Sequence, residues 1–182
     1  MHRIVSGITT LCQHIDTLRD TPNIYHPRCC STCGHGVLWN HGCYFRKAVR
    51  GLAFDDGSQK LIPIPIPRYL CSFCQRSCSR LPSCVPPRRW YSWQLQQQVL
   101  QSLLTVYSLR GCGIRHGLCR STVRRWWNWL ELNALRFEFF LRSRYPEWGR
   151  ATDSPSFWRI CLCSMPLSEI MTRLDHEGVT VP

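Results

Sequence analysis

Apolar residues recur at helical spacing along residues 93–107. Leu95, Val99 and Leu103 lie about one turn apart, and Ser92 stands just before the segment, at a position that suits an N-cap. Further apolar side chains widen this stripe: Leu100, Leu104 and Tyr107. Most glutamines of the segment fall on the other side. The pattern predicts a packing helix whose apolar stripe faces a core.

A short segment, a glycine turn and a second periodic segment follow, at residues 109–116, 117–119 and 120–130. In the last of these, apolar side chains share one face: Val123, Trp126 or Trp127, and Leu130. Polar and basic side chains share the opposite face: Ser121, Arg124, Arg125 and Asn128. These residue types suit phosphates and base edges in a major groove, so the pattern predicts a helix-turn-helix. Periodicity alone also allows an amphipathic surface helix with solvated arginines.

Two glycines weaken the middle helix of this arrangement. Gly111 and Gly113 lie inside it, and each costs about 1 kcal/mol relative to alanine in a helix. We therefore expect residues 109–116 to be frayed or partly irregular.

Prolines alternate with isoleucines in residues 62–67. Proline has no amide hydrogen, so this spacing removes hydrogen-bond donors from one side of an extended chain only. A strand over residues 61–70 can pair through its other side and is expected at a sheet edge. Residues 42–49 suit a second strand, and residues 55–58 (Asp-Asp-Gly-Ser) suit a turn between the two. The segment predicts a β-hairpin.

Composition divides the chain into four stretches, which we expect to be its domains: a leader (1–27), a zinc ribbon rich in Cys, Pro and Gly (28–87), a helix-turn-helix (88–145) and a tail (146–182). The tail contains two expected short helices, around residues 156–164 and 167–176. The expected fold class is α+β, with an N-terminal zinc-ribbon β-hairpin followed by the helical domain.

Two CxxC pairs mark a metal site. Cys30 pairs with Cys33, and Cys71 pairs with Cys74. A two-residue gap lets both thiolates point at one ion, and two such knuckles complete a tetrahedral shell. Four thiolates with no open position favour structural zinc, Zn²⁺, over a catalytic metal. Because the segment has little core of its own, we expect its folding to depend on the metal.

Other interpretations of these cysteines stay open. An iron–sulfur cluster, redox-active pairs and four unrelated core thiols are the alternatives. Cys29 could compete with Cys30, although only Cys30 has the two-residue spacing to Cys33. Cys78 and Cys84 are spare candidates near the second pair.

Basic residues outnumber acidic ones by 23 to 11, for a formal charge of +12. Only Lys47 and Lys60 are lysines, and arginine can contact phosphate or guanine through two N–H groups at once. This bias favours a polyanion partner. No apolar run approaches the ~20 residues of a spanning helix, and residues 1–14 show no signal peptide. We therefore expect a cytoplasmic protein that binds no membrane, whose clustered cysteines hold metal rather than disulfides.

Motifs around the cysteine pairs follow one another along the chain: Cys30, Cys33 and Gly34; Trp39, His41, Gly42, Tyr44 and Arg46; Ile64 to Tyr69 with Cys71 and Cys74; Leu81 and Pro82; Pro87 to Tyr91. Together they resemble the zinc-ribbon proteins of bacterial insertion sequences, and residues 120–126 are similar to the homeodomain-like helix-turn-helix of that family. The likeness spans residues 25–140. The chain departs from the family pattern in two respects: Gly111 and Gly113 replace helix formers, and there are many cysteines outside the two pairs.

The resemblance implies roles for particular residues. By it, the zinc ligands are Cys30, Cys33, Cys71 and Cys74. The DNA-binding residues lie within 120–128: Arg120, Ser121, Thr122, Arg124, Arg125 and Asn128.

The acidic residues do not suit a nuclease or transposase. A two-metal site needs three carboxylates held by a sizeable α/β domain, and only 52 residues follow Leu130. We therefore expect no enzyme activity. The favoured function is binding of double-stranded DNA, as an accessory or regulatory protein of a mobile element that works beside a separate transposase chain. A zinc-dependent protein-interaction adaptor and an RNA-binding protein are the alternatives.

Overall fold

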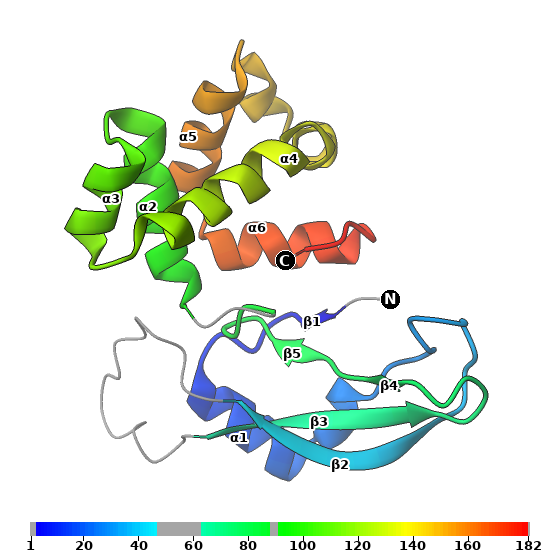
Figure 1. The fold of residues 1–182 in the computed structure, drawn as a ribbon. Helices are drawn as coiled ribbons and strands as arrows, with labels where there is room; N and C mark the ends of the chain where they lie inside the picture. Colours follow the sequence, from blue (N-terminus) through cyan, green and yellow to red (C-terminus); the bar gives the residue numbers. More distant parts are fainter. Residues whose placement is uncertain (1–2, 47–62, 88–90, 182) are drawn as a thin grey trace. The chain divides into compact units, whose positions relative to one another are not determined.

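The protein is a mixed α+β chain in a computed structural model that describes residues 3–46, 63–87 and 91–181. It divides into two compact units, Met1–Ser92 with Thr180–Pro182, and Trp93–Val179 (Figure 1). In the described part of the chain, the first unit carries the strands, one α-helix and one short 3-10 helix, and the second unit is helical. The expected α+β class is confirmed. The boundaries differ from the four expected stretches, because the leader and the tail are built into the two units.

An antiparallel sheet in the order β2-β3-β4 forms the frame of the first unit. Its strands are β2 (Leu38–Arg46), β3 (Ile64–Cys71) and β4 (Ser77–Cys78). The β2–β3 pairing matches the expected hairpin, with β2 starting four residues earlier than expected at Leu38. The register shifts between Asn40 and Cys43, and Gly42 between them has φ of +70°. The expected turn at 55–58 lies outside the described residues.

The alternating prolines occupy the part of β3 that has one neighbour. β4 pairs only with Tyr69 and Leu70 of β3, beyond Pro65 and Pro67. Among the described residues, β2 is thus the only strand alongside the proline segment. The edge position is therefore local, since β3 as a whole lies between two strands. This arrangement costs no ladder hydrogen bonds, because the missing amides face a side without a partner strand.

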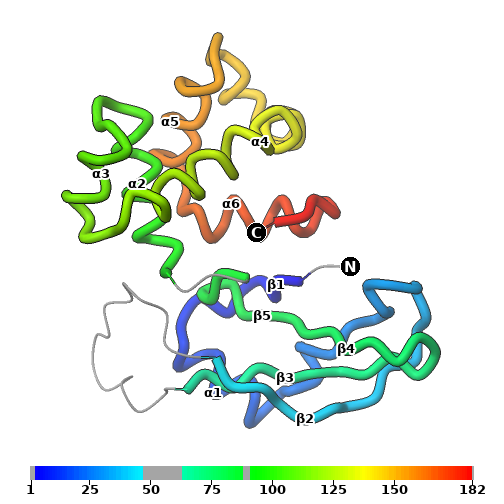
Figure 2. The backbone as a smooth tube through the Cα atoms, viewed as in Figure 1, coloured from blue at the N-terminus to red at the C-terminus, as the bar shows by residue number. Residues whose placement is uncertain are grey.

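The leader belongs to the first unit. Strand β1 (Ile4–Val5) runs parallel to β5 (Leu81–Pro82), and Figures 1 and 2 show the two segments side by side. Helix α1 (Leu11–Asp20) follows, then the short helix η1 (Pro22–Tyr25). Thr10 and Gln13 form a capping box at the start of α1. That Thr-x-x-Gln pattern is the sequence signal from which α1 could have been predicted.

His14 joins α1 to the sheet. Its side chain is buried, and its Nε2 lies 2.8 Å from the carbonyl oxygen of Pro65. A carbonyl oxygen only accepts, so Nε2 carries the proton. Nδ1 then accepts from the hydroxyl of Tyr25 at 2.6 Å. Both ring nitrogens are satisfied in the neutral form, so His14 is a structural residue of the core.

Acidification is expected to destabilise the first unit through His14. Burial lowers the pKa of His14 below its usual 6.5, against the opposing effect of the bond to Pro65. The unfolded chain therefore takes up this proton first, and the stabilisation is complete above about pH 6.5. It is lost as the pH falls through the lower pKa of the folded state. Urea unfolding between about pH 7.5 and pH 5 should show a steeper pH dependence for the wild type than for His14→Gln. Equal slopes would assign the titration to another group.

The second unit consists of five α-helices among the described residues: α2 (Trp93–Thr105), α3 (Leu109–His116), α4 (Arg120–Arg144), α5 (Ser154–Ser164) and α6 (Leu167–His176). A short helix η3 (Pro146–Arg150) joins α4 to α5. Most of the expected inward residues are buried: Val99, Leu100, Leu104, Val123, Trp126 and Leu130. Leu95 and Leu103 are half-buried, whereas Tyr107 is exposed and lies beyond the end of α2. Aromatic residues of α4 and α5 complete the core: Phe137, Phe157 and Trp158. None of these described helices is both long and apolar enough to cross a membrane.

Gln97 and Gln101 fix the tail against α2. Gln97 Nε2 donates to the carbonyl of Leu162 at 2.7 Å, and Gln97 Oε1 accepts from the amide of Leu167 at 2.7 Å. Gln101 Nε2 donates to the same Leu162 carbonyl at 2.9 Å. The two amides thus satisfy backbone groups at the junction of α5 and α6. The boundary expected at 145/146 has no counterpart, because these glutamines face protein rather than water.

Helix α3 is continuous through both of its glycines. A Cβ at Gly113 would lie 2.8 Å from the carbonyl oxygen of Leu118, so only glycine lets the following turn approach this closely. The Leu118 amide donates to the Gly113 carbonyl at 2.8 Å, and Gly117 ends the helix with φ of +63°. The expectation of a frayed helix was therefore wrong. Tight packing of the turn compensates the low helix propensity of glycine.

Candidate metal centre and basic helix face

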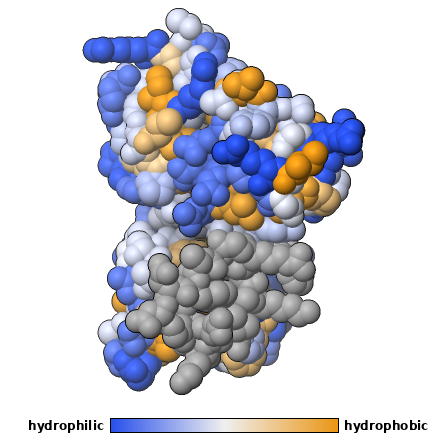
Figure 3. Space-filling view, turned by 90° about the vertical axis from the view of Figure 1, so that its left-hand side faces the viewer, coloured by the Kyte–Doolittle hydropathy of each residue, from blue (hydrophilic) through white to orange (hydrophobic). Residues whose placement is uncertain are grey.

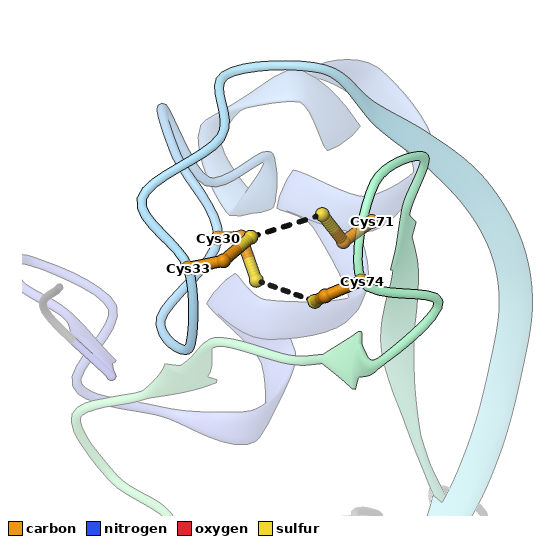
Figure 4. A group of neighbouring side chains, drawn as sticks. All are labelled: Cys30, Cys33, Cys71 and Cys74. Carbon is orange, nitrogen blue, oxygen red and sulfur yellow. Dashed lines mark hydrogen bonds between the residues drawn. The ribbon is translucent and has the colours of Figure 1, made fainter.

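The two CxxC pairs are brought together by the β2–β3 ladder. Cys30 and Cys33 lie in the loop before β2, Cys71 is the last residue of β3, and Cys74 lies in the turn that follows. Leu38, the first residue of β2, pairs with Cys71 across the ladder. The first loop therefore enters the sheet beside the point where the second loop leaves it, and the four side chains point toward one another (Figure 4).

The four sulfur atoms have the spacing of a tetrahedral metal shell. They all lie within 4.8 Å of one another. Cys30 Sγ is 3.6 Å from Cys74 Sγ, and Cys33 Sγ is 3.6 Å from Cys71 Sγ. A tetrahedron with metal–sulfur bonds of about 2.3 Å has edges of about 3.8 Å, whereas a disulfide needs about 2.05 Å. The cluster matches a shared ion and not a disulfide, and all thirteen cysteines are free thiols.

The two knuckles have the same backbone. In the first, the Gly34 amide donates to the Cys30 carbonyl at 3.0 Å. In the second, the Gln75 amide donates to the Cys71 carbonyl at 3.1 Å. Gly34 and Gln75 occupy equivalent positions with φ of +75° and +55°, and Gln75 is the only described non-glycine residue with positive φ. Equal turns at both pairs, one of them strained, indicate that the four sulfurs are positioned as a set.

The thiols conflict electrostatically unless a cation lies among them. Amide hydrogen bonds within the first knuckle, led by that of Cys33, lower the pKa of Cys30 to about 6. The Cys74 amide likewise lowers the pKa of Cys71. At Cys74 the Arg76 amide acts in the same direction, but burial and the other three sulfurs outweigh it and raise the pKa to about 12. Two thiols favour ionisation while a third opposes it, and a bound dication would allow all four to be thiolates.

The competing cysteines lie outside the cluster. Within the described residues, Cys30, Cys33, Cys71 and Cys74 are the one group of three or more side chains that could hold a metal ion. Cys29, Cys78 and Cys84 are not members of it, although Cys78 packs in the same buried cluster as Cys30 and Cys71. The choice of Cys30 over Cys29 follows from the two-residue spacing, as the sequence indicated.

The basic residues of α4 share an exposed face. Arg120, Ser121, Arg124, Arg125 and Asn128 are all exposed. These residues lie opposite the buried side chains of the same helix, so the guanidinium groups of the three arginines are free to reach a ligand. Figure 3 shows that hydrophilic side chains are prominent on one side of the helical unit, with apolar patches between them.

Thr122 differs from the other residues to which DNA binding was assigned. Its side chain is buried, and its hydroxyl lies 2.9 Å from Cys119 Sγ. Cys119 is the N-cap of α4, and its sulfur also lies 3.2 Å from the hydroxyl of Ser121. Burial leaves Thr122 no direct route to a groove, and its position suits anchoring of the turn before the helix.

The start of α4 is electropositive. Its first turn contains no acidic residue, and the first amides of a helix attract anions. Along the whole chain, no Asp or Glu occurs between Asp56 and Glu131, a stretch with one lysine and ten arginines. Hydrogen bonds from Ser121 and Thr122 lower the pKa of the Cys119 thiol to about 7. The helix N-terminus and the run of arginines favour a negatively charged ligand at this end of α4, whereas a thiolate at Cys119 would oppose one.

Comparison of the chain with protein-family models, with curated proteins and with solved structures finds no match.

Proposed function

We propose that this chain binds double-stranded DNA through the N-terminal half of α4, and that Zn²⁺ held by the four clustered cysteines stabilises the first unit. The observation that carries the proposal is the exposed face of Arg120, Ser121, Arg124, Arg125 and Asn128 on a helix that follows a tight turn. This is the arrangement that a recognition helix needs in order to enter a major groove.

The chemistry of the face suits a duplex. Arg124 and Arg125 can each contact a phosphate or a guanine edge with two N–H groups, and Asn128 can do the same with adenine. The amides at the start of α4 and the hydroxyl of Ser121 suit a backbone phosphate. Helix α3 precedes α4 through the Gly117 turn, so the three helices α2, α3 and α4 have the order of a helix-turn-helix domain.

Zinc is the metal that best fits the cysteine cluster. Four thiolates at tetrahedral spacing leave no open coordination position, which favours a structural role over catalysis. An iron–sulfur cluster also takes four cysteines, and its visible absorption separates it from colourless zinc.

The biological setting rests on the resemblance to the zinc-ribbon proteins of bacterial insertion sequences. On that basis we place the chain as an accessory or regulatory DNA-binding protein of a mobile element, working beside a separate transposase chain. No enzymatic activity is assigned to it.

Titration of a fluorescent duplex at several salt concentrations tests the proposed function. If the three arginines Arg120, Arg124 and Arg125 each replace a counterion, log K should fall against log salt with a slope of about −2.7. Single-stranded RNA of the same length, added as a competitor, should displace the duplex poorly. A flat salt dependence would favour a protein-interaction adaptor, and preferential displacement by RNA would favour an RNA-binding protein.

A further inference from the structure

The exposed face of α4 changes character halfway along the helix. Beyond the basic half, three large apolar side chains are exposed: Leu132 by 85%, Leu135 by 88% and Phe139 by 69%. They lie three and four residues apart, so they form one stripe, here called the apolar seam. The opposite face of the same segment is buried through Phe137 and Leu141. Contiguous exposed apolar side chains of this size commonly mark an interaction site.

The spacing of the seam is that of a coiled-coil contact. In a heptad numbered from a to g, Leu132 and Phe139 take position a, and Leu135 takes position d. Position g before the seam is Glu131, and position e within it is Arg136. Both are exposed, and neither forms an ion pair within the described part of the chain.

These two charges distinguish the possible orientations of a partner helix. When two copies of a helix pair in parallel, a g residue faces the e residue five positions later on the other copy. Glu131 would then face Arg136 of the second copy, and symmetry repeats the pair on the other side. In an antiparallel pair, g faces g and e faces e, which brings like charges together. The seam is therefore self-complementary in the parallel orientation.

We propose that the apolar seam binds a second copy of this chain, with the two α4 helices parallel. Arg125 and Asn128 fall on positions a and d one heptad earlier, where two arginines would face each other, so the contact is confined to the apolar seam and the basic halves of the two helices diverge. If the basic half binds DNA as proposed above, one duplex can be held by both copies. Three apolar side chains per copy cover far less than the ~1,200 Å² of a stable interface, so the pair is concentration-dependent and strengthened by DNA.

Sedimentation of the full-length protein without DNA tests the pairing. The wild type should show a monomer–dimer equilibrium. Leu135→Glu keeps helix propensity, and because Leu135 is exposed it should leave the melting temperature unchanged while weakening association at least about tenfold. Val106→Glu, at an apolar residue 90% exposed outside α4, is the matched control and should associate like the wild type.

Charge reversal tests the orientation. E131R should weaken the dimer several-fold, because it places arginines opposite each other, and E131R/R136E should restore it. A wild type that is monomeric throughout, a dimer that Leu135→Glu leaves intact, or a dimer indifferent to E131R would overturn the proposal. Equal loss in Leu135→Glu and Val106→Glu would also overturn it. All of these measurements omit DNA, so they do not depend on the proposed function.

Discussion

Replacement of Cys71 by serine is expected to unfold the first unit while the second unit stays helical. Cys71 is buried at the end of β3 and belongs both to the four-sulfur cluster and to the packed cluster around Tyr25, Leu38 and Tyr69. A structural zinc site contributes of the order of 10 kcal/mol, which is comparable to the whole stability of a domain, about 5–15 kcal/mol. The free energy lost with one zinc ligand should therefore be larger than the stability that the core of this unit provides by itself.

The measurement combines metal content with segment-resolved hydrogen exchange. Wild-type protein should contain one zinc per chain, and Cys71→Ser should contain little. Amides of β1 to β5 and α1 should exchange fast in the variant or after chelation, whereas those of α2 to α6 should stay protected. Cys12→Ser, at an exposed cysteine of α1 in the same unit, is the matched control and should behave as the wild type. If complete metal removal leaves circular dichroism and melting unchanged, the cluster does not hold a structural metal.

Substitution of Arg124 and Arg125 together by alanine is expected to reduce duplex affinity by about a hundredfold or more. Each arginine can supply a contact worth about 1–3 kcal/mol, and two lost phosphate contacts would lower the magnitude of the salt slope by about 1.8. Folding should be unaffected, because both side chains are exposed and alanine is the best helix former.

The matched control for this variant removes the same number of positive charges at positions outside α4. Arg150→Ala/Arg159→Ala removes two exposed arginines of η3 and α5, outside the proposed recognition helix. It should retain most of the affinity and show only the small loss due to lower net charge. Fluorescence anisotropy at several salt concentrations, with melting curves for both variants, gives the affinities and the salt slopes. Equal affinities of the two double variants would remove α4 from the binding site.

The cysteine cluster is the part of the site that sequence reasoning predicted best. Ligand spacing is a local constraint, and the four residues with CxxC spacing are the four that meet in space. The outward face of α4 was also predictable from periodicity, because Val123, Trp126 and Leu130 have one side of the helix as their shared core face. Thr122 is next to Ser121 in the sequence but lies on the buried side of the helix. The resemblance assigned DNA binding to the continuous range 120–128, and Thr122 was therefore included.

The extent of α4 and the position of the tail could not be predicted in the same way. The apolar seam places Leu132, Leu135 and Phe139 on the outer face, so apolar residues occur on both sides of α4 beyond Leu130 and the helical periodicity disappears. Gln97 appeared to belong to a solvated face, yet it bonds to backbone groups some 65 to 70 residues away. A partner so distant in the sequence leaves no local pattern.

The packing of the tail against α2 and α4 determines how this protein could be divided or shortened. A chain cut after residue 145 would retain every helix of the expected DNA-binding domain. It would lose the buried Trp158, whose ring packs against Phe137, and the buried Phe157, whose ring packs against Trp158. The exposed arginines of α4 would then stand on a helix whose opposite, apolar side is open to water. Residues 146–179 thus belong to the same helical unit as α4, and any grafting or truncation has to carry them along.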